Sequence, residues 1–266
     1  MTQKLIDLTL TFADGKRGVS FDRELTLAED GFNTTTLHIY SHALTHMDSP
    51  KHFLEDGYTM EQMNLEKCMG MAEVIDLSHK APDSLILVED VISHAERIHE
   101  GTRLLLRTDW DSHADIEDYR NQFPRISPEL AEWLVERGIS LLGVETPSVA
   151  SLAQENYEEL RDVHRTLLSA DVVIIESLCN LRLLPEQVTF IAFPLKLEDC
   201  DGSPVRAVAL SSIMNACRRV TRSARTRRRP SSNSRTATTS PRIPPGRSLR
   251  SIVFCNSIRP TRTRTM

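Results

Sequence analysis

The sequence predicts an α/β fold. Segments typical of strands and helices alternate at least twice between residues 72 and 144, which favours α/β layering over an all-β or all-α architecture. Hydrophobic residues make up 40% of the 266 positions, enough for a substantial core. A chain of this length forms one large domain or two small ones.

The first part of the chain contains short segments with the periodicity of strands. Residues 4–10 alternate apolar and polar side chains, and the glycines within residues 13–18 end that segment. Residues 34–40 are rich in β-branched side chains and lead directly into a group of histidines. Residues 72–77 predict a further strand. We interpret four methionines as packing residues and not as a cofactor site: Met60, Met63, Met69 and Met71.

The middle of the chain predicts helices next to strands. Residues 88–99 predict a helix, and the apolar residues within 103–107 predict a buried strand. Residues 127–137 begin with Ser-Pro, a capping residue followed by a proline in the first helical position, and Gly138 ends this helix. A short apolar strand over residues 139–144 follows immediately.

Four potential metal ligands lie within eleven residues: His42, His46, Asp48 and His52. All are at even positions, and an extended chain directs alternate side chains to one face. Imidazole nitrogen and carboxylate oxygen suit zinc or manganese. The alternative is that these residues decorate a surface strand and the loop after it.

The spacing of the histidines requires a bend. A straight strand would separate the backbones of His42 and His46 by roughly 13 Å, too far for both rings to bind one ion. We therefore predict a bend at Leu44 and Thr45, after which Pro50 fixes an extended exit. Helical HExxH spacing is absent, so the sequence does not support a zincin site.

Two further candidates lie in the second half. Residues 172–176 are an apolar run that ends in Glu176, and a buried carboxylate is costly unless it is paired or bound to metal. His164 lies twelve residues earlier, on a helix predicted over residues 158–168. The alternatives are a strand-end carboxylate in water and a surface histidine.

These segments resemble one known family. Residues 42–52, HALTHMDSPKH, are similar to the H-x-G-T-H-x-D-x-P-x-H signature of the metal-dependent cyclase family, which includes bacterial kynurenine formamidase and isatin hydrolase. Residues 164–181 resemble the second metal-binding segment of that family. The resemblance covers about residues 4–212, with further similar segments at 108–111, 143–149 and 193–206. Leu44 departs from the family glycine.

The resemblance implies a fold and an activity. The implied fold is the swivelling β/β/α domain, a mixed sheet with flanking helices, over residues 1–215. The activity is hydrolysis of an amide bond, N-formyl or cyclic, in a small aromatic substrate by metal-activated water. The alternatives are a hydrolase of another cyclic substrate, such as isatin, a lactone or an imide, and a non-catalytic binding protein. Homodimers are usual in the family.

The resemblance also implies a role for each site residue. Two divalent ions are expected, with zinc the first choice and manganese the second. The family pattern places His42, His46 and Asp48 on one ion, with Asp48 and Glu176 bridging to a second ion that His164 also holds. His52 is the expected proton shuttle. Trp110 is expected to pack against the substrate.

The charge distribution divides the chain. Residues 218–266 contain fourteen arginines and no acidic residue, so residues 1–217 carry a net charge of about −19. An acidic body argues against nucleic acid as a natural ligand. The composition of residues 216–266 predicts a disordered tail or a non-native, frameshifted end, and a basic arm for nucleic acid is the alternative.

The remaining sequence features concern the cellular compartment of the protein. The five cysteines form no CxxC pair, and neither a signal peptide nor a run of eighteen apolar residues is present. We therefore predict a cytoplasmic protein that does not act on membranes.

Overall fold

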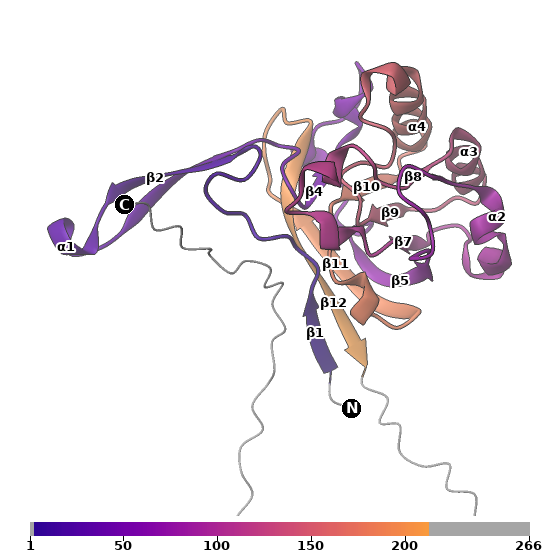
Figure 1. The fold of residues 1–266 in the computed structure, drawn as a ribbon, viewed down its shortest axis with the longest axis horizontal. Coiled ribbons are helices and arrows are strands. Elements are labelled where there is room, and N and C mark those ends of the chain that lie inside the picture. Colours follow the sequence, from indigo (N-terminus) through magenta and orange to yellow (C-terminus); the bar gives the residue numbers. More distant parts are fainter. Residues whose placement is uncertain (1–2, 213–266) are drawn as a thin grey trace, which may run out of the picture.

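The computed structural model describes residues 3–212 (Figure 1). The predicted tail, residues 216–266, lies outside the described residues. The proposed body, residues 1–215, is therefore described almost throughout.

Within the described residues, the largest sheet has eight strands and closes on itself. The strand order is β1-β12-β11-β5-β7-β9-β10-β4, and β4 pairs with β12 as well as with β10, so the strands from β12 to β4 form a ring. The strands are β1 Gln3–Asp7, β4 His46–Asp48, β5 Met69–Asp76, β7 Arg103–Arg107, β9 Leu141–Val144, β10 Val173–Glu176, β11 Gln187–Pro194 and β12 Gly202–Ser212. Parallel pairs join β5, β7, β9 and β10, and antiparallel pairs join the rest. The prediction of a mixed α/β fold is confirmed, and the sheet is in addition closed.

A two-stranded arm extends from the body (Figure 1). It consists of β2 Val19–Leu25 and β3 Thr34–Ile39, connected through the short helix α1 Leu27–Asp30. The strand predicted over residues 34–40 therefore exists, but it pairs only within this arm. A second small pair is parallel and joins β6 Leu85–Ile86 to β8 Arg125–Ile126.

Helices cover one side of the ring (Figure 1). They are α2 Val88–Val91, α3 Pro128–Glu136 and α4 Tyr157–Ser169. Ser127 caps α3 by accepting a hydrogen bond from the Leu130 amide, as predicted. The single helix predicted over residues 88–99 is wrong, because α2 is followed by a 3₁₀ helix at Ile92–Arg97. Three β-branched residues, Val88, Val91 and Ile92, weaken the α-helical preference there. In the described part of the chain, no helix has the length and apolar character needed to cross a membrane.

Two cores result from the alternation of side chains along the buried strands. Leu105 and Ile175 belong to the core inside the ring, whereas Leu104 and Ile174 belong to the core between the ring and the helices. Met60 and Met63 are buried inside the ring, which confirms the packing prediction for these two. The prediction is wrong for Met69 and Met71, which are 51% and 57% exposed on β5.

Candidate metal centre

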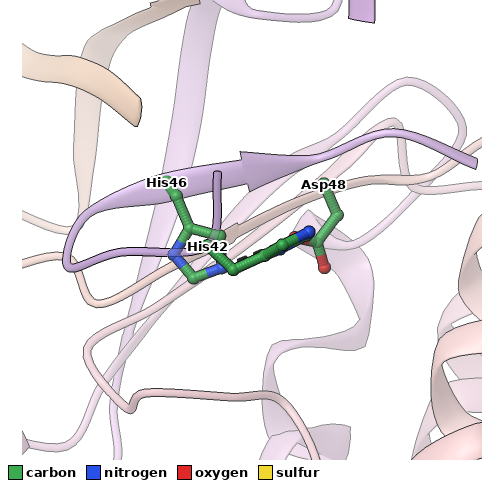
Figure 2. A group of neighbouring side chains, drawn as sticks. All are labelled: His42, His46 and Asp48. Carbon is green, nitrogen blue, oxygen red and sulfur yellow. Dashed lines mark hydrogen bonds and ion pairs between the residues drawn. The ribbon is translucent and has the colours of Figure 1, made fainter. Parts of the chain in front are cut away.

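The ring and one helix bring the predicted ligands together. On β4, Met47 points into the ring core while His46 and Asp48 take the opposite face. Glu176 at the end of β10 is the register partner of His46, and α4 packs beside β10 and supplies His164. Figure 2 shows the imidazoles of His42 and His46 gathered beside Asp48. Helix α4 therefore covers the site from the side of the helical layer.

Each of the two buried carboxylates lies between imidazole rings. Oδ1 of Asp48 lies 3.0 Å from Nδ1 of His42 and 3.5 Å from Nε2 of His46. Glu176 lies 3.3 Å from Nε2 of His46 and 3.5 Å from Nε2 of His164. The ligand atoms form two groups, His42-His46-Asp48 and Asp48-His164-Glu176, each within 4.8 Å. The structure thus brings all five predicted ligands into one centre in which Asp48 is shared.

Backbone carbonyls orient two of the rings. Nδ1 of His46 lies 2.7 Å from the Leu44 oxygen, and Nδ1 of His164 lies 2.7 Å from the Leu160 oxygen. A carbonyl only accepts, so each Nδ1 carries a proton and Nε2 is the nitrogen that faces the centre, where it can bind an ion once it has lost its own proton. Oδ2 of Asp48 is buried and has no hydrogen-bond partner among the described residues. Nε2 of His164 lies 3.9 Å from this oxygen. A buried carboxylate oxygen without a partner, beside an imidazole nitrogen, fits a divalent cation.

The electrostatics of the metal-free centre show how it compensates for its buried charges. Burial alone would lower the pKa of His42, but its hydrogen bond to Asp48 raises that pKa to about 9. Burial would likewise lower the pKa of His164, but its hydrogen bond to Glu176 raises that pKa. Burial would raise the pKa of Glu176, whereas hydrogen bonds from His164 and His46 lower it. Protonated rings therefore supply the positive charge that a metal ion would otherwise supply.

The predicted bend lies at Leu44, which has φ 51°, in the left-handed region. This bend brings His42 back to within 3.0 Å of Asp48. Thr45 fixes the bend, because its hydroxyl donates to the Ser177 oxygen and accepts from the Leu10 amide. A side chain in the left-handed conformation costs roughly 1 to 2 kcal/mol, which explains the glycine of the family signature.

We expect Leu44→Gly protein to be more stable than Leu44→Ala protein by about 1 kcal/mol. Both changes remove the contacts of Leu44 with the cluster around Leu10 and Trp110, but only glycine relieves the left-handed strain. Urea denaturation measures the difference, and bound metal should be unchanged in both. Equal stability of the two variants would show that the bend stores no strain.

His52 stands beside the centre in the 3₁₀ turn Pro50–His52. Its ring stacks on His42 at a centroid distance of 3.9 Å, and its side chain retains 25% exposure. Burial lowers the pKa of His52, so the ring is largely neutral near pH 7 and able to accept a proton. It belongs to neither ligand group that contains Asp48, and forms a third potential group with His42 and Asp201.

Trp110 is buried next to the bend. Its indole donates to the Tyr119 oxygen at 2.9 Å and stacks on His113 at 4.1 Å. It is 4% exposed and packs in the cluster that Leu44 borders, so it leaves little free surface for a substrate. Its predicted contact with substrate stays a prediction.

Three residues that touch the centre were assigned no role from the sequence. Asp201 has its Oδ2 atom 3.2 Å from Nε2 of His42, and Gly202 lies against the His42 ring. The available signal was the D-G-S-P-V-R segment at residues 201–206, which resembles a family segment. Phe53, which stacks on His164 at 4.3 Å, also received no role.

Comparisons with known proteins agree with this geometry. The family model for Cyclase matches residues 6–151. Kynurenine formamidase from Bacillus cereus is 33% identical over 195 residues, covering 73% of this chain and 88% of the relative. Kynurenine formamidase from Bacillus mycoides is 34% identical over 176 residues, covering 66% and 79%.

Among solved structures, isatin hydrolase A from Labrenzia aggregata, bound to benzyl benzoate, is similar with a TM-score of 0.69 at 25% identity. The match covers 78% of this chain and 93% of that structure. The likeness therefore extends over most of this chain and nearly all of that structure.

Proposed function

The chain belongs to the Cyclase family, and from this premise we propose that it is a kynurenine formamidase-like, metal-dependent hydrolase. It acts on a carbon–nitrogen bond other than a peptide bond, as its relatives named kynurenine formamidase and isatin hydrolase do. The observation that carries this function is the buried centre in which Asp48 and Glu176 each face two imidazoles.

We propose that the centre holds two divalent ions, zinc first and manganese second. His42, His46 and Asp48 hold one ion, and Asp48, Glu176 and His164 hold the other, which the two overlapping groups support. Such ions lower the pKa of a bound water towards neutrality and polarise a carbonyl oxygen. Carboxylates suit the shared positions because each offers two oxygens.

His52 supplies the acid–base chemistry in this proposal. Its neutral ring accepts the proton of the attacking water while the carbon–oxygen bond forms. It then returns that proton to the leaving nitrogen as the carbon–nitrogen bond breaks. The lowered pKa of His52 and its partial exposure beside His42 support this role.

The substrate is a small aromatic amide in this proposal. A hollow of about 540 Å³ is lined by Pro204, the register partner of His46, and by the apolar side chains of Leu10, Phe12 and Ile39, while the proposed metal ligands lie outside its lining. The likeness to isatin hydrolase A favours a cyclic amide as the second candidate. A panel of N-formyl aromatic amines, isatin, lactones and cyclic imides, assayed with zinc or manganese, tests both. A protein that binds metal but hydrolyses none of these would be a non-catalytic binding member.

We further propose a homodimer in which the arm contacts the second subunit. Most of the arm is exposed, with Leu27 and Phe32 at its tip and Leu37 along β3, at 65%, 55% and 56% exposure. A two-stranded ribbon is marginally stable alone, so it needs a packing surface. Exposed apolar side chains on an unsupported ribbon indicate such a surface.

We expect the double change Phe32→Asp and Leu37→Asp to shift the protein from dimer to monomer. Two charges in an apolar contact remain unpaired, which weakens association. Light scattering during size-exclusion chromatography measures the mass. Leu87→Asp, at an exposed apolar position on the body, is the control and should leave the mass unchanged. A monomeric parent protein would rule out the dimer.

We propose that residues 1–215 form one domain of the swivelling β/β/α class and act in the cytoplasm. The closed ring and its single helical layer support the domain.

Truncation after residue 215 is expected to leave melting temperature and turnover unchanged, because the composition of residues 216–266 lacks a core-forming pattern. A large fall in melting temperature would show that these residues pack on the body. Loss of RNA binding in low salt would instead support the basic-arm alternative.

A further inference from the structure

We propose that Asp201 is a positioning residue for His42, holding the ring so that Nδ1 faces the metal, with Gly202 providing the space for it. This inference rests on the proposed metal centre. It concerns residues that contact a metal ligand and hold its ring in place. It concerns the third imidazole, because the other two are already oriented by backbone carbonyls.

Among residues 3–212, no backbone carbonyl accepts a hydrogen bond from the ring of His42. Its Nδ1 faces Asp48, whereas its Nε2 is buried and makes no aligned hydrogen bond among the described residues. Oδ2 of Asp201 lies 3.2 Å from this Nε2. A ligating histidine usually donates its other N–H to a carboxylate or carbonyl, which fixes the tautomer and makes the ligand more basic. Asp201 is the group in position to do this for His42.

Asp201 is held for this contact from both sides. Its Oδ1 accepts a hydrogen bond from the Ser41 hydroxyl at 3.0 Å, which leaves Oδ2 for the ring. Its backbone oxygen accepts from the Ser49 amide at 2.9 Å, at the end of β4. The carboxylate is thereby anchored to the residue before His42 and to the residue after Asp48.

Gly202 supplies a second, independent observation. A Cβ at this position would lie 2.7 Å from Cε1 and 2.9 Å from Nε2 of His42, so the ring would have to move. His42 has little freedom to do so, because it stacks on His52 at 3.9 Å. Position 202 therefore requires glycine, because the ring of His42 approaches its backbone so closely.

The experiment measures Co²⁺ and Zn²⁺ binding to the full-length protein, with the visible absorption of bound Co²⁺ as the report on coordination. Asp201→Ala is expected to weaken binding about 10- to 100-fold and to change the spectrum at saturating Co²⁺. Asp201→Asn, whose amide oxygen still accepts, should be intermediate. Gly202→Ala should also weaken binding. Glu198→Gln removes an exposed charge from the same loop and should match the parent protein.

Three results would overturn the proposal. Parent affinity and spectrum in Asp201→Ala protein would show that the contact does not position His42. Loss of one whole equivalent of bound ion, with the remaining affinity unchanged, would show that His42, His52 and Asp201 hold an ion of their own. If the parent protein binds neither Co²⁺ nor Zn²⁺, the proposed metal centre itself is wrong, and this outcome is distinct from the other two.

Discussion

His52→Ala protein is expected to retain its metal and lose roughly 10²- to 10⁴-fold in turnover, the range for a positioned acid–base group. His46→Ala, His164→Ala and Asp48→Ala proteins are expected to lose metal and activity together, because a metal site depends on its complete ligand set. The difference follows from geometry, since the rings of His46 and His164 direct Nε2 at Glu176. The ring of His52 instead stacks on His42 and belongs to neither ligand group that contains Asp48.

Two measurements separate the His52 variant from the ligand variants: metal content by elemental analysis, and turnover on a substrate from the panel. His79→Ala changes a histidine with 65% side-chain exposure and is the control for the loss of an imidazole. If His52→Ala protein lost metal to the same degree as His46→Ala protein, His52 would be a ligand. The proton shuttle would then be another residue.

Removal of metal by a chelator is expected to lower the free energy of unfolding by roughly 3 to 4 kcal/mol, relative to protein in free metal at 100 to 1,000 times its dissociation constant. The ion binds the folded centre and not the dispersed ligands of the unfolded chain. Without it, Asp48 and Glu176 stay buried and depend on protonated imidazoles. Urea denaturation with and without chelator measures the change.

The metal contribution should increase with pH. In the metal-free protein the pKa of His42 is about 9, above its ordinary value of 6.5. The stability gained from this proton is fully present below pH 6.5 and is lost as pH rises through 9. Metal must displace the same proton, so its affinity increases over that window. Asp48→Asn protein should show no chelator effect at any pH, and a residual effect would place the metal elsewhere.

The sequence could predict the parts of this centre that depend on local geometry. The even spacing of His46 and Asp48 places them on one face of β4, and the distance to His42 requires the bend found at Leu44. His164 and Glu176 could be connected to that group only through the family resemblance, because no local pattern shows which strand lies beside β4.

What could not be predicted depends on pairing between distant segments. Asp201 reaches His42 because the start of β12 pairs with β4, and nothing in residues 201–206 indicates that partner. The closure of the sheet was missed for the same reason. Local preference also failed at α2, where the apolar spacing resembles a helix but β-branched residues shorten it.

The strand that closes the ring, β4, has a consequence for the folding kinetics. β4 contains three residues, and its two neighbours lie more than a hundred residues later in the chain. Such long-range pairing gives a high contact order, and the entropy of closing these loops must be overcome before the contacts form, which slows folding. His46 and Asp48 leave the ribosome early but have no strand on either side until residues 173–204 have been synthesised. A nascent chain therefore has no assembled centre until synthesis of this domain is nearly complete, and ring closure and ligand assembly occur in the same late step.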